Sequence, residues 1–361
     1  MTPILKQLAQ LVAALAALYG VALAVTLVLV PPNDALDRLD SARAGASLYM
    51  TEPKYVFLAR TRLDTPADKV VLVGASNMLA GFRQAQMQAL LPDAEVHNLS
   101  VGGSNVTQVA QIVDLVREVQ SPEARRHTTW VIGTWYGLFA DDRARWYTDD
   151  RHGGDTDIDI ERYRYGFYRR TDDGPRPVLP PDRLETGVTL IHPYLVLDRV
   201  ARDMTRSLRA RIAAKPKVIT DDERNAVVLT AEQKQAYLAF WRSYMGRTDT
   251  LGDAPFRTLE QLIDVLLMDG SRVVLVDMPL PAWHRAGSPL AADYERRTAS
   301  FFAALRTRPG VSVVPAFEGS DLDFSDEVHP KPRVTAQWAR RLATAMTTPP
   351  PAALTQSASA Q

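Results

Sequence analysis

The chain has 361 residues, and its 42 basic and 42 acidic side chains leave no net charge, so nothing in its charge favours nucleic acid or an anionic surface as a partner. It contains no cysteine, which excludes disulfides, thiolate metal sites and a cysteine nucleophile. The six histidines and the lack of an HExxH motif give no sign of a metal site, and we expect no metal or other cofactor.

The first expected element is a membrane-spanning helix. Residues 7–30 carry no charged side chain and are followed by two prolines, and about 20 apolar residues suffice to cross a bilayer. A cleavable signal peptide is the alternative, with the Ala-Leu-Ala stretch at 22–24 as its cleavage site. We favour an uncleaved anchor over residues 1–32, because the apolar run continues beyond that stretch as far as Val30.

The charges that flank this helix predict its orientation. Lys6 precedes the helix, whereas Asp34, Asp37 and Asp40 follow it. Positive charge is enriched on the cytoplasmic side of membrane helices, which places the N-terminus in the cytoplasm. We therefore expect a single-pass protein of the bacterial inner membrane, with the rest of the chain in the periplasm.

A charged connector at 33–69, with a short helix over 34–44, leads into alternating strands and helices. The expected strands are 70–73, 95–99, 129–132, 272–276 and 311–314. The expected helices are 78–91, 105–119, 259–268, 290–305 and 334–346. This alternation predicts one α/β domain over 70–346, with a mostly parallel sheet and helices on both faces. We expect the tail at 347–361 to be disordered.

The alternation is interrupted at 141–255, which is rich in Arg, Asp and Tyr and has no strong strand pattern. We expect an insertion of loops and helices there, a candidate cap over the site. Aromatic and basic side chains gather within it, at Tyr163, Tyr165, Phe167 and Tyr168 and at Arg162, Arg164, Arg169 and Arg170. Such a cluster can hold sugar rings or phosphates, but packing of the rings against the domain is the favoured interpretation.

Four short motifs carry the chemistry. They read Gly74-Ala75-Ser76-Asn77, Asn98-Leu99-Ser100-Val101-Gly102-Gly103-Ser104, Ile132-Gly133-Thr134-Trp135-Tyr136-Gly137-Leu138 and Asp326-Glu327-Val328-His329-Pro330. A serine at the carboxyl end of a parallel strand, with an aspartate and a histidine elsewhere, is the residue set of an acyl-transfer triad. In content and order the four motifs resemble the SGNH (GDSL-type) superfamily of hydrolases and acyltransferases. The resemblance covers residues 68–140 and 270–345.

The resemblance implies a flavodoxin-like three-layer α/β/α fold and a role for each motif residue. Ser76 is the nucleophile, His329 is the base that takes its proton, and Asp326 orients the imidazole. The backbone N–H groups of Ser76 and Gly103 form the oxyanion hole, where glycine allows close approach of the substrate.

One position departs from the family. The family usually has an Asn two residues after the glycine of the third motif and uses its side chain as a further oxyanion donor, but this chain has Trp135 there. Either two backbone donors suffice, or Trp135 or Tyr136 fills in, or the protein acts poorly on ordinary esters. Membrane-anchored SGNH-like proteins of exopolysaccharide and cell-wall acylation systems depart from the pattern in comparable ways.

Structural roles compete with these functional ones. Ser76 is alternatively a helix cap, the Asp326–His329 pair is alternatively a cap at a helix start, and the two glycines of the second motif are alternatively a plain turn. Capping is also common for an Asn beside a helix start, and exposed loop positions are common for histidine. The candidates for substrate binding are Asn77, Trp135, Tyr136 and His284.

The expected function is transfer of an O-acetyl or other short acyl group to a polysaccharide, or its hydrolysis from one, through an acyl-Ser76 intermediate. The expected partners are this polysaccharide or another acylated glycan, with a membrane-bound acyl-donor protein or a polysaccharide synthase complex. The alternative is a non-catalytic accessory or glycan-binding protein of such a complex. The altered third motif favours this alternative, whereas the complete set of Ser, Asp and His argues against it.

Overall fold

The computed structural model describes residues 3–29, 56, 60–141, 157–164, 166–172, 174–194, 220–317 and 319–347. The chain divides into two compact units. One unit combines Met1–Ala67, Thr107–His127 and Asp142–Glu223, and the other combines Asp68–Val106, Thr128–Asp141 and Arg224–Gln361. The expected helix at 34–44, the tail from 348 onward and Tyr165 lie outside the described residues.

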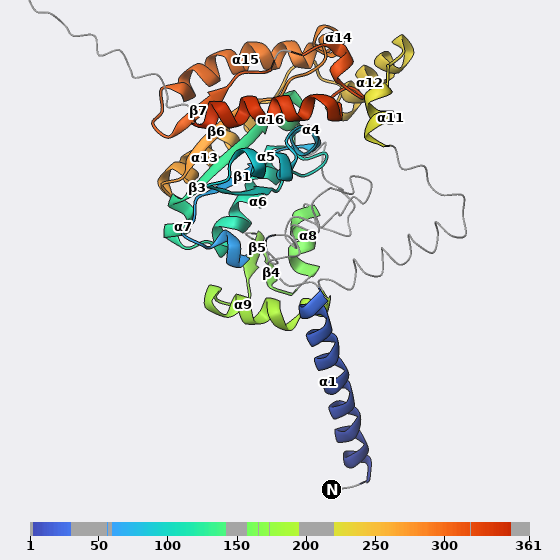
Figure 1. Ribbon diagram of the computed structural model, residues 1–361, viewed down its shortest axis with the longest axis vertical. Helices are drawn as coiled ribbons and strands as arrows, with labels where there is room; N and C mark the ends of the chain where they lie inside the picture. Colours follow the sequence, from blue (N-terminus) through green and yellow to red (C-terminus); the bar gives the residue numbers. More distant parts are fainter. Residues whose placement is uncertain are drawn as a thin grey trace, which may run out of the picture. The chain divides into compact units, whose positions relative to one another are not determined.

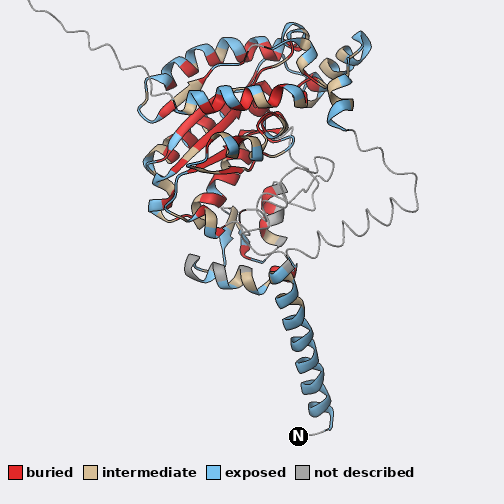
Figure 2. Cartoon of the chain, in the orientation of Figure 1, coloured by how far each residue is buried: buried red, intermediate tan, exposed pale blue. Residues whose placement is uncertain are grey.

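The second unit is built on a five-stranded parallel sheet (Figure 1). Its strands are β1 (Lys69–Val73), β2 (Glu95–Asn98), β3 (Thr128–Thr134), β6 (Arg272–Asp277) and β7 (Val311–Val314). They lie in the order β2-β1-β3-β6-β7, so all five predicted strands are confirmed. β1 is buried along its whole length, as a parallel strand is when both faces of its sheet are covered (Figure 2).

The direction in which the chain adds strands reverses at β1. This strand is paired with both β2 and β3, so the chain builds toward one edge first and then toward the other. Ligands of open parallel sheets bind at the carboxyl ends of the strands where such a reversal occurs. Ser76 follows β1 and Trp135 follows β3, so both residues lie at the carboxyl ends of the strands where the reversal occurs.

Helices flank the sheet. In this unit α4 (Ser76–Gly81) and α5 (Gln84–Leu90) pack against α16 (Pro332–Thr347), while α13 (Ala254–Met268) packs against β6 and α15 (Pro289–Arg306) against β7. Apolar side chains at helical spacing form the buried face of α13, namely Phe256, Leu259, Leu262, Ile263 and Leu266. The other elements of the unit are η1 (Tyr136–Phe139), α12 (Ala231–Tyr244), α14 (Ala282–Gly287) and η3 (Asp321–Asp323).

The helix predicted over 78–91 is in fact two helices. The chain leaves α4 at Phe82, with φ −127° and ψ 79°, and Arg83 is extended before α5 begins. The Phe82 ring is fully buried and meets Phe317 edge-on, with 6.1 Å between the ring centroids. At this break the helix is interrupted and the Phe82 ring is buried instead.

The break also lays α5 along the outer edge of β2. Side-chain oxygens of Gln84 and Gln88 accept hydrogen bonds from the backbone N–H groups of Asn98 and Val96, each at 3.0 Å. The Gln88 amide also donates to the Ala94 carbonyl at 2.8 Å. Edge strands normally expose such groups to water, and here the side chains of a helix satisfy them.

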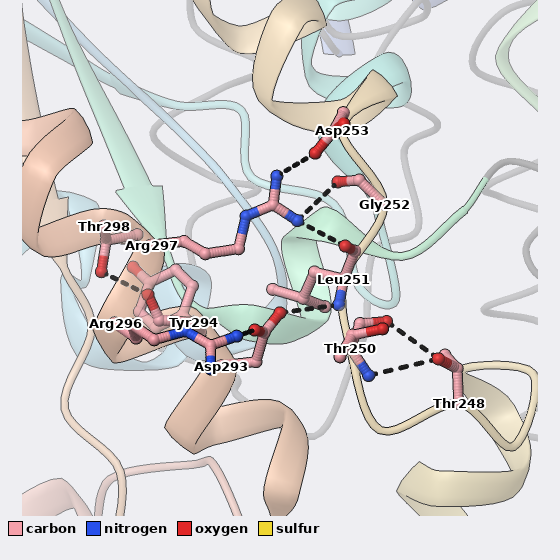
Figure 3. A network of polar contacts seen from close by, with 10 residues as sticks. All are labelled: Thr248, Thr250, Leu251, Gly252, Asp253, Asp293, Tyr294, Arg296, Arg297 and Thr298. Carbon is pink, nitrogen blue, oxygen red and sulfur yellow. Dashed lines mark hydrogen bonds and ion pairs between the residues drawn. The ribbon is translucent and has the colours of Figure 1, made fainter.

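A polar network ties the segment between α12 and α13 to α15 (Figure 3). The buried Asp293 carboxylate accepts the Leu251 N–H at 2.8 Å. The Arg297 guanidinium donates to the Leu251 carbonyl and pairs with Asp253. These contacts fix the end of the insertion onto the helix that covers β7.

The first unit contains most elements of the insertion, whereas α12 belongs to the second unit. Those in the first unit are α8 (Asp157–Arg164), β4 (Tyr168–Thr171), β5 (Gly174–Pro177) and α9 (Pro181–Leu190), and the unit also includes α7 (Pro122–Arg126) and nearly all of α6 (Val106–Val119), while α11 (Asp221–Ala226) spans its last residues. β4 and β5 form an antiparallel pair, which the sequence did not predict. The rings of Phe167 and Tyr168 are buried, and the Arg162 guanidinium lies 5.0 Å from the centre of the Tyr168 ring. These aromatic and basic side chains thus pack within the unit.

The first unit also contains the apolar helix α1 (Pro3–Leu29). Its apolar window has a mean hydropathy of 2.5, and none of it is buried. The Tyr19 hydroxyl donates to the Leu190 carbonyl at the end of α9. Length and composition make α1 compatible with either a membrane anchor or a signal sequence.

Candidate active site

Two glycines let the first and third motifs approach each other closely beside Ser76. Gly74 has φ +153°, and a Cβ at that residue would lie 3.1 Å from the carbonyl oxygen of Gly133. A Cβ on Gly133 would lie 2.8 Å from the sulfur of Met78 in α4. Glycine at both positions therefore allows α4 to pack this tightly against β3.

The second motif is fastened to the first. The Val101 N–H and the Ser104 hydroxyl both donate to the Gly74 carbonyl, at 2.9 Å and 3.0 Å. A Cβ on Gly102 would lie 3.9 Å from the Cβ of Ser76, which places this loop directly beside the serine. Gly103 follows with φ +73°, a left-handed backbone that favours glycine. The predicted oxyanion residues, Ser76 and Gly103, therefore belong to neighbouring segments.

Ser76 is the first residue of α4, and Ala75 occupies the N-cap position. The Ser76 side chain is partly exposed, and it makes no hydrogen bond within the described residues. Asn77 next to it is fully buried, and its side-chain oxygen accepts the Met78 N–H at 2.9 Å. Capping of this helix start thus does not use the Ser76 hydroxyl, which is available for chemistry.

Asp326 and His329 form a hydrogen-bonded pair. The Asp326 Oδ2 atom lies 2.8 Å from His329 Nδ1. Its Oδ1 atom accepts the backbone N–H groups of Val328 and His329, at 3.0 Å and 2.7 Å. The aspartate therefore caps the turn and orients the ring at the same time. The side chain of His329 is 32% exposed, so its ring is accessible to a substrate.

The electrostatics of this pair suit a general base. Burial by itself would lower the pKa of His329, but the Asp326 hydrogen bond and the negative charges of Asp326 and Glu327 outweigh burial and raise this pKa. Burial acts to raise the pKa of Asp326, and its hydrogen bonds with His329 and Val328 lower it overall. Asp326 is thus an anion, and with Nδ1 engaged, His329 accepts protons at Nε2.

The helix that begins with Ser76 packs against the turn that contains His329. A Cβ on Gly81, at the end of α4, would lie 3.6 Å from Pro330 and 3.4 Å from the Trp338 ring in α16. The described chain has no hydrogen bond between the Ser76 and His329 side chains. Such contacts often form only when the substrate is bound.

Aromatic side chains fill the space beneath the third motif. The Trp135 indole meets the Trp241 ring of α12 edge-on, with 4.7 Å between centroids. The Trp135 indole also lies where a side chain on residue 137 would be, which explains the glycine at that position. The Trp135 indole nitrogen is buried without a hydrogen-bond partner. Because it is inaccessible to solvent, it does not point into an open oxyanion site.

The same aromatic group contacts the Asp326–His329 turn through Glu327. The Trp241 indole donates to the Glu327 carboxylate at 3.1 Å. His284 Nδ1 lies 2.7 Å from the Glu327 carbonyl oxygen, and His284 Nε2 lies 2.6 Å from the Tyr136 hydroxyl. The insertion and α14 thus both contribute contacts to the turn.

The four residues predicted to bind substrate are all buried. Their exposed fractions are at most 2%, for Asn77, Trp135, Tyr136 and His284. Substrate contact by their side chains stays a prediction. The structure shows instead the contacts of these side chains with residues in or beside the motifs. Sequence reasoning missed Trp241 and Glu327, because the first lies in the insertion and the second was read only as a spacer between Asp326 and His329.

Searches against protein-family models and curated proteins found no match to this chain. Among the described residues no group of three or more acidic or histidine side chains could hold a metal ion.

Proposed function

We propose that this chain is an SGNH-type serine acyl-transfer enzyme that faces the periplasm. The single observation that carries the proposal is the Asp326–His329 pair, whose turn packs against the helix that begins at Ser76. The strand order β2-β1-β3-β6-β7 supports it as well. Counted along the chain, this is the flavodoxin-like order 2-1-3-4-5, whose ligands bind at the reversal point occupied here by the Ser76 motif.

The proposed chemistry proceeds in two half-reactions. The Ser76 oxygen attacks the carbonyl carbon of an acyl donor while His329 Nε2 takes the hydroxyl proton. The donor's alkoxide leaves with that proton, and the acyl group remains on Ser76 as an ester. A sugar hydroxyl or water then gives its proton to His329, attacks the ester and restores Ser76. The developing oxyanion is stabilised by the N–H groups of Ser76 and Gly103.

The proposed substrate is an O-acylated polysaccharide, with a short acyl group such as acetyl. The apolar helix α1 supports this through localisation, since a membrane anchor would hold the enzyme where exported glycans pass. The partners proposed with it are a membrane-bound acyl donor and a polysaccharide synthase complex. Transfer and hydrolysis differ only in whether a sugar hydroxyl or water attacks acyl-Ser76.

One observation favours a second candidate, a non-catalytic glycan-binding accessory protein. The third motif lacks the usual Asn, and the indole nitrogen of Trp135 is buried and does not replace it. An accessory protein has no need of a third oxyanion donor. The complete set of Ser76, Asp326 and His329 argues against this candidate, because an accessory protein has no need of all three.

Labelling with a fluorophosphonate separates the two candidates. The purified protein should be labelled at Ser76, as located by peptide mass spectrometry, and Ser76→Ala should abolish the label. Ser300→Ala is the matched control, since Ser300 is an exposed serine on α15 whose hydroxyl bonds only its own helix. Incubation with a small acetyl ester should add an acetyl group to Ser76. Absence of both modifications from the folded protein would favour the accessory role.

A further inference from the structure

We propose that Tyr136 and His284 form a buried positioning relay that holds the Asp326–His329 turn in its working geometry. This inference rests on the proposed function, because it assigns these two residues to the positioning of the same general base. Neither residue touches substrate in this role. The relay runs from the third motif, through α14, to the fourth motif.

The hydrogen bonds of the relay have a fixed direction. The Glu327 carbonyl only accepts, so His284 Nδ1 carries a proton and donates to it at 2.7 Å. Burial lowers the pKa of His284, so its ring is neutral and its Nε2 atom accepts. The Tyr136 hydroxyl therefore donates to Nε2 at 2.6 Å.

The relay contacts the turn at Glu327, which the hydrogen bonds that close the turn do not hold. The base of the turn is closed by the Ser325 N–H, which donates to the His329 carbonyl at 2.9 Å, and by a bridge between Phe324 and Pro330. The outer part, at Glu327, is held from outside by His284 on its carbonyl and by Trp241 on its carboxylate. Residues Asp326 and His329 lie on either side of this anchored segment.

The His284 ring is itself immobilised. It is fully buried, and the neighbouring Trp283 ring stacks on it with 5.3 Å between centroids and 17° between planes. The fully buried Tyr136 hydroxyl fixes its other nitrogen. Because the ring is held at both nitrogens and on one face, it can move little, which suits a positioning role. It also explains why these polar side chains are buried, since buried polar groups are retained when each has its partner.

The altered third motif acquires a role from this relay. Instead of an Asn at position 135, the motif offers Tyr136, which acts on the catalytic turn through His284. Trp135 packs beside it against Trp241, the second anchor of Glu327. The third motif thus stays coupled to the general base by a different route.

The test compares His284→Asn with His284→Leu. Asparagine keeps an N–H donor near the Nδ1 position, whereas leucine removes both hydrogen bonds at similar volume. In His284→Leu we expect kcat for an aryl acetate to fall at least tenfold with KM within twofold of wild type. His284→Asn should recover most of the loss, and Tyr136→Phe should give a partial loss. Thermal melting curves verify that each variant is folded.

A readout that needs no turnover separates failure of the relay from failure of the proposed function. The proton shared by Asp326 and His329 gives a downfield proton NMR signal in such pairs. We expect this signal in wild type and in His284→Asn, and its loss or broadening in folded His284→Leu. An unchanged signal and unchanged kcat in His284→Leu would overturn the relay. A changed signal in a protein without turnover would keep the relay and remove the proposed function.

Discussion

In the proposed mechanism, the neighbours of His329 let it act as a base only above mildly acidic pH. Its pKa is raised above the ordinary value of 6.5, by Asp326 and Glu327 acting against burial. Protonated imidazole cannot accept the Ser76 proton, so kcat/KM should fall as the pH drops below this raised pKa. We expect the acid limb of the pH–rate profile above pH 6.5.

Asp326→Asn provides the control for this limb. It removes the charge and the acceptor that raise the pKa of His329, so the limb should move to lower pH while the maximal rate falls. A wild-type limb well below pH 6, or a limb that Asp326→Asn leaves in place, would assign the titration to another group.

Trp135 stands where SGNH-type enzymes, which the motifs resemble, usually have an Asn as an oxyanion donor, but its indole nitrogen is buried and unpaired. Trp135→Phe removes this N–H and keeps much of the aromatic packing against Trp241. We expect it to retain most of the turnover of a small aryl acetate, with Ser76→Ala as the background. Loss of an oxyanion donor costs about 3 kcal/mol. A hundredfold decrease in the folded variant would therefore show that the indole does act on the oxyanion.

At the scale of elements, the contact between α4 and β3 depends on glycine. A Cβ on Gly133 would lie 2.8 Å from the Met78 sulfur and 3.0 Å from its Cβ. Gly133→Ala should push α4 away from the sheet and destabilise the fold by about 1–3 kcal/mol. Gly102→Ala is the matched control, because a Cβ there would meet only the Ser76 Cβ at 3.9 Å. Denaturant unfolding measures both, and equal stabilities would contradict this account of the packing.

The strands were predictable from the sequence because each is a short apolar run between turns. β1, with Val70, Val71, Leu72 and Val73, is fully buried, which gives an unambiguous pattern. The hairpin of β4 and β5 was missed because two arginines occupy β4 and two prolines occupy β5. Proline lacks the N–H of a strand and reads as a loop. The break at Phe82 was missed because its cause, the Phe317 ring, is far away in the sequence.

The candidate site was predictable only in part, for a related reason. Ser76, Asp326 and His329 stand in short motifs, and the last two are bonded three residues apart. The partners of Glu327 come from distant segments, at His284 and Trp241, and no local pattern joins them. Burial of the predicted substrate-binding residues also depends on packing between segments, which the sequence does not display.

At the scale of the whole molecule, the sheet-containing unit should not depend on the apolar helix. The motifs and the sheet begin at Lys69, α1 is assigned to the other unit, and none of its apolar window is buried. Deletion of residues 1–32 should therefore yield a soluble protein with cooperative unfolding, whereas the full chain should partition with membranes. A reporter that is active only in the periplasm should be active when fused after residue 361. Aggregation or loss of folding on deletion would mean that α1 belongs to the core.

The glutamines of α5 have a consequence for how copies of this protein meet. A parallel sheet that ends in a bare strand invites another chain to add to it, since its backbone groups act as a template. At β2 the outward N–H groups of Val96 and Asn98 are already bonded to Gln88 and Gln84. Concentrated protein is thus protected at this side from intermolecular strand pairing. Two uncharged side chains achieve this protection without adding charge close to the site.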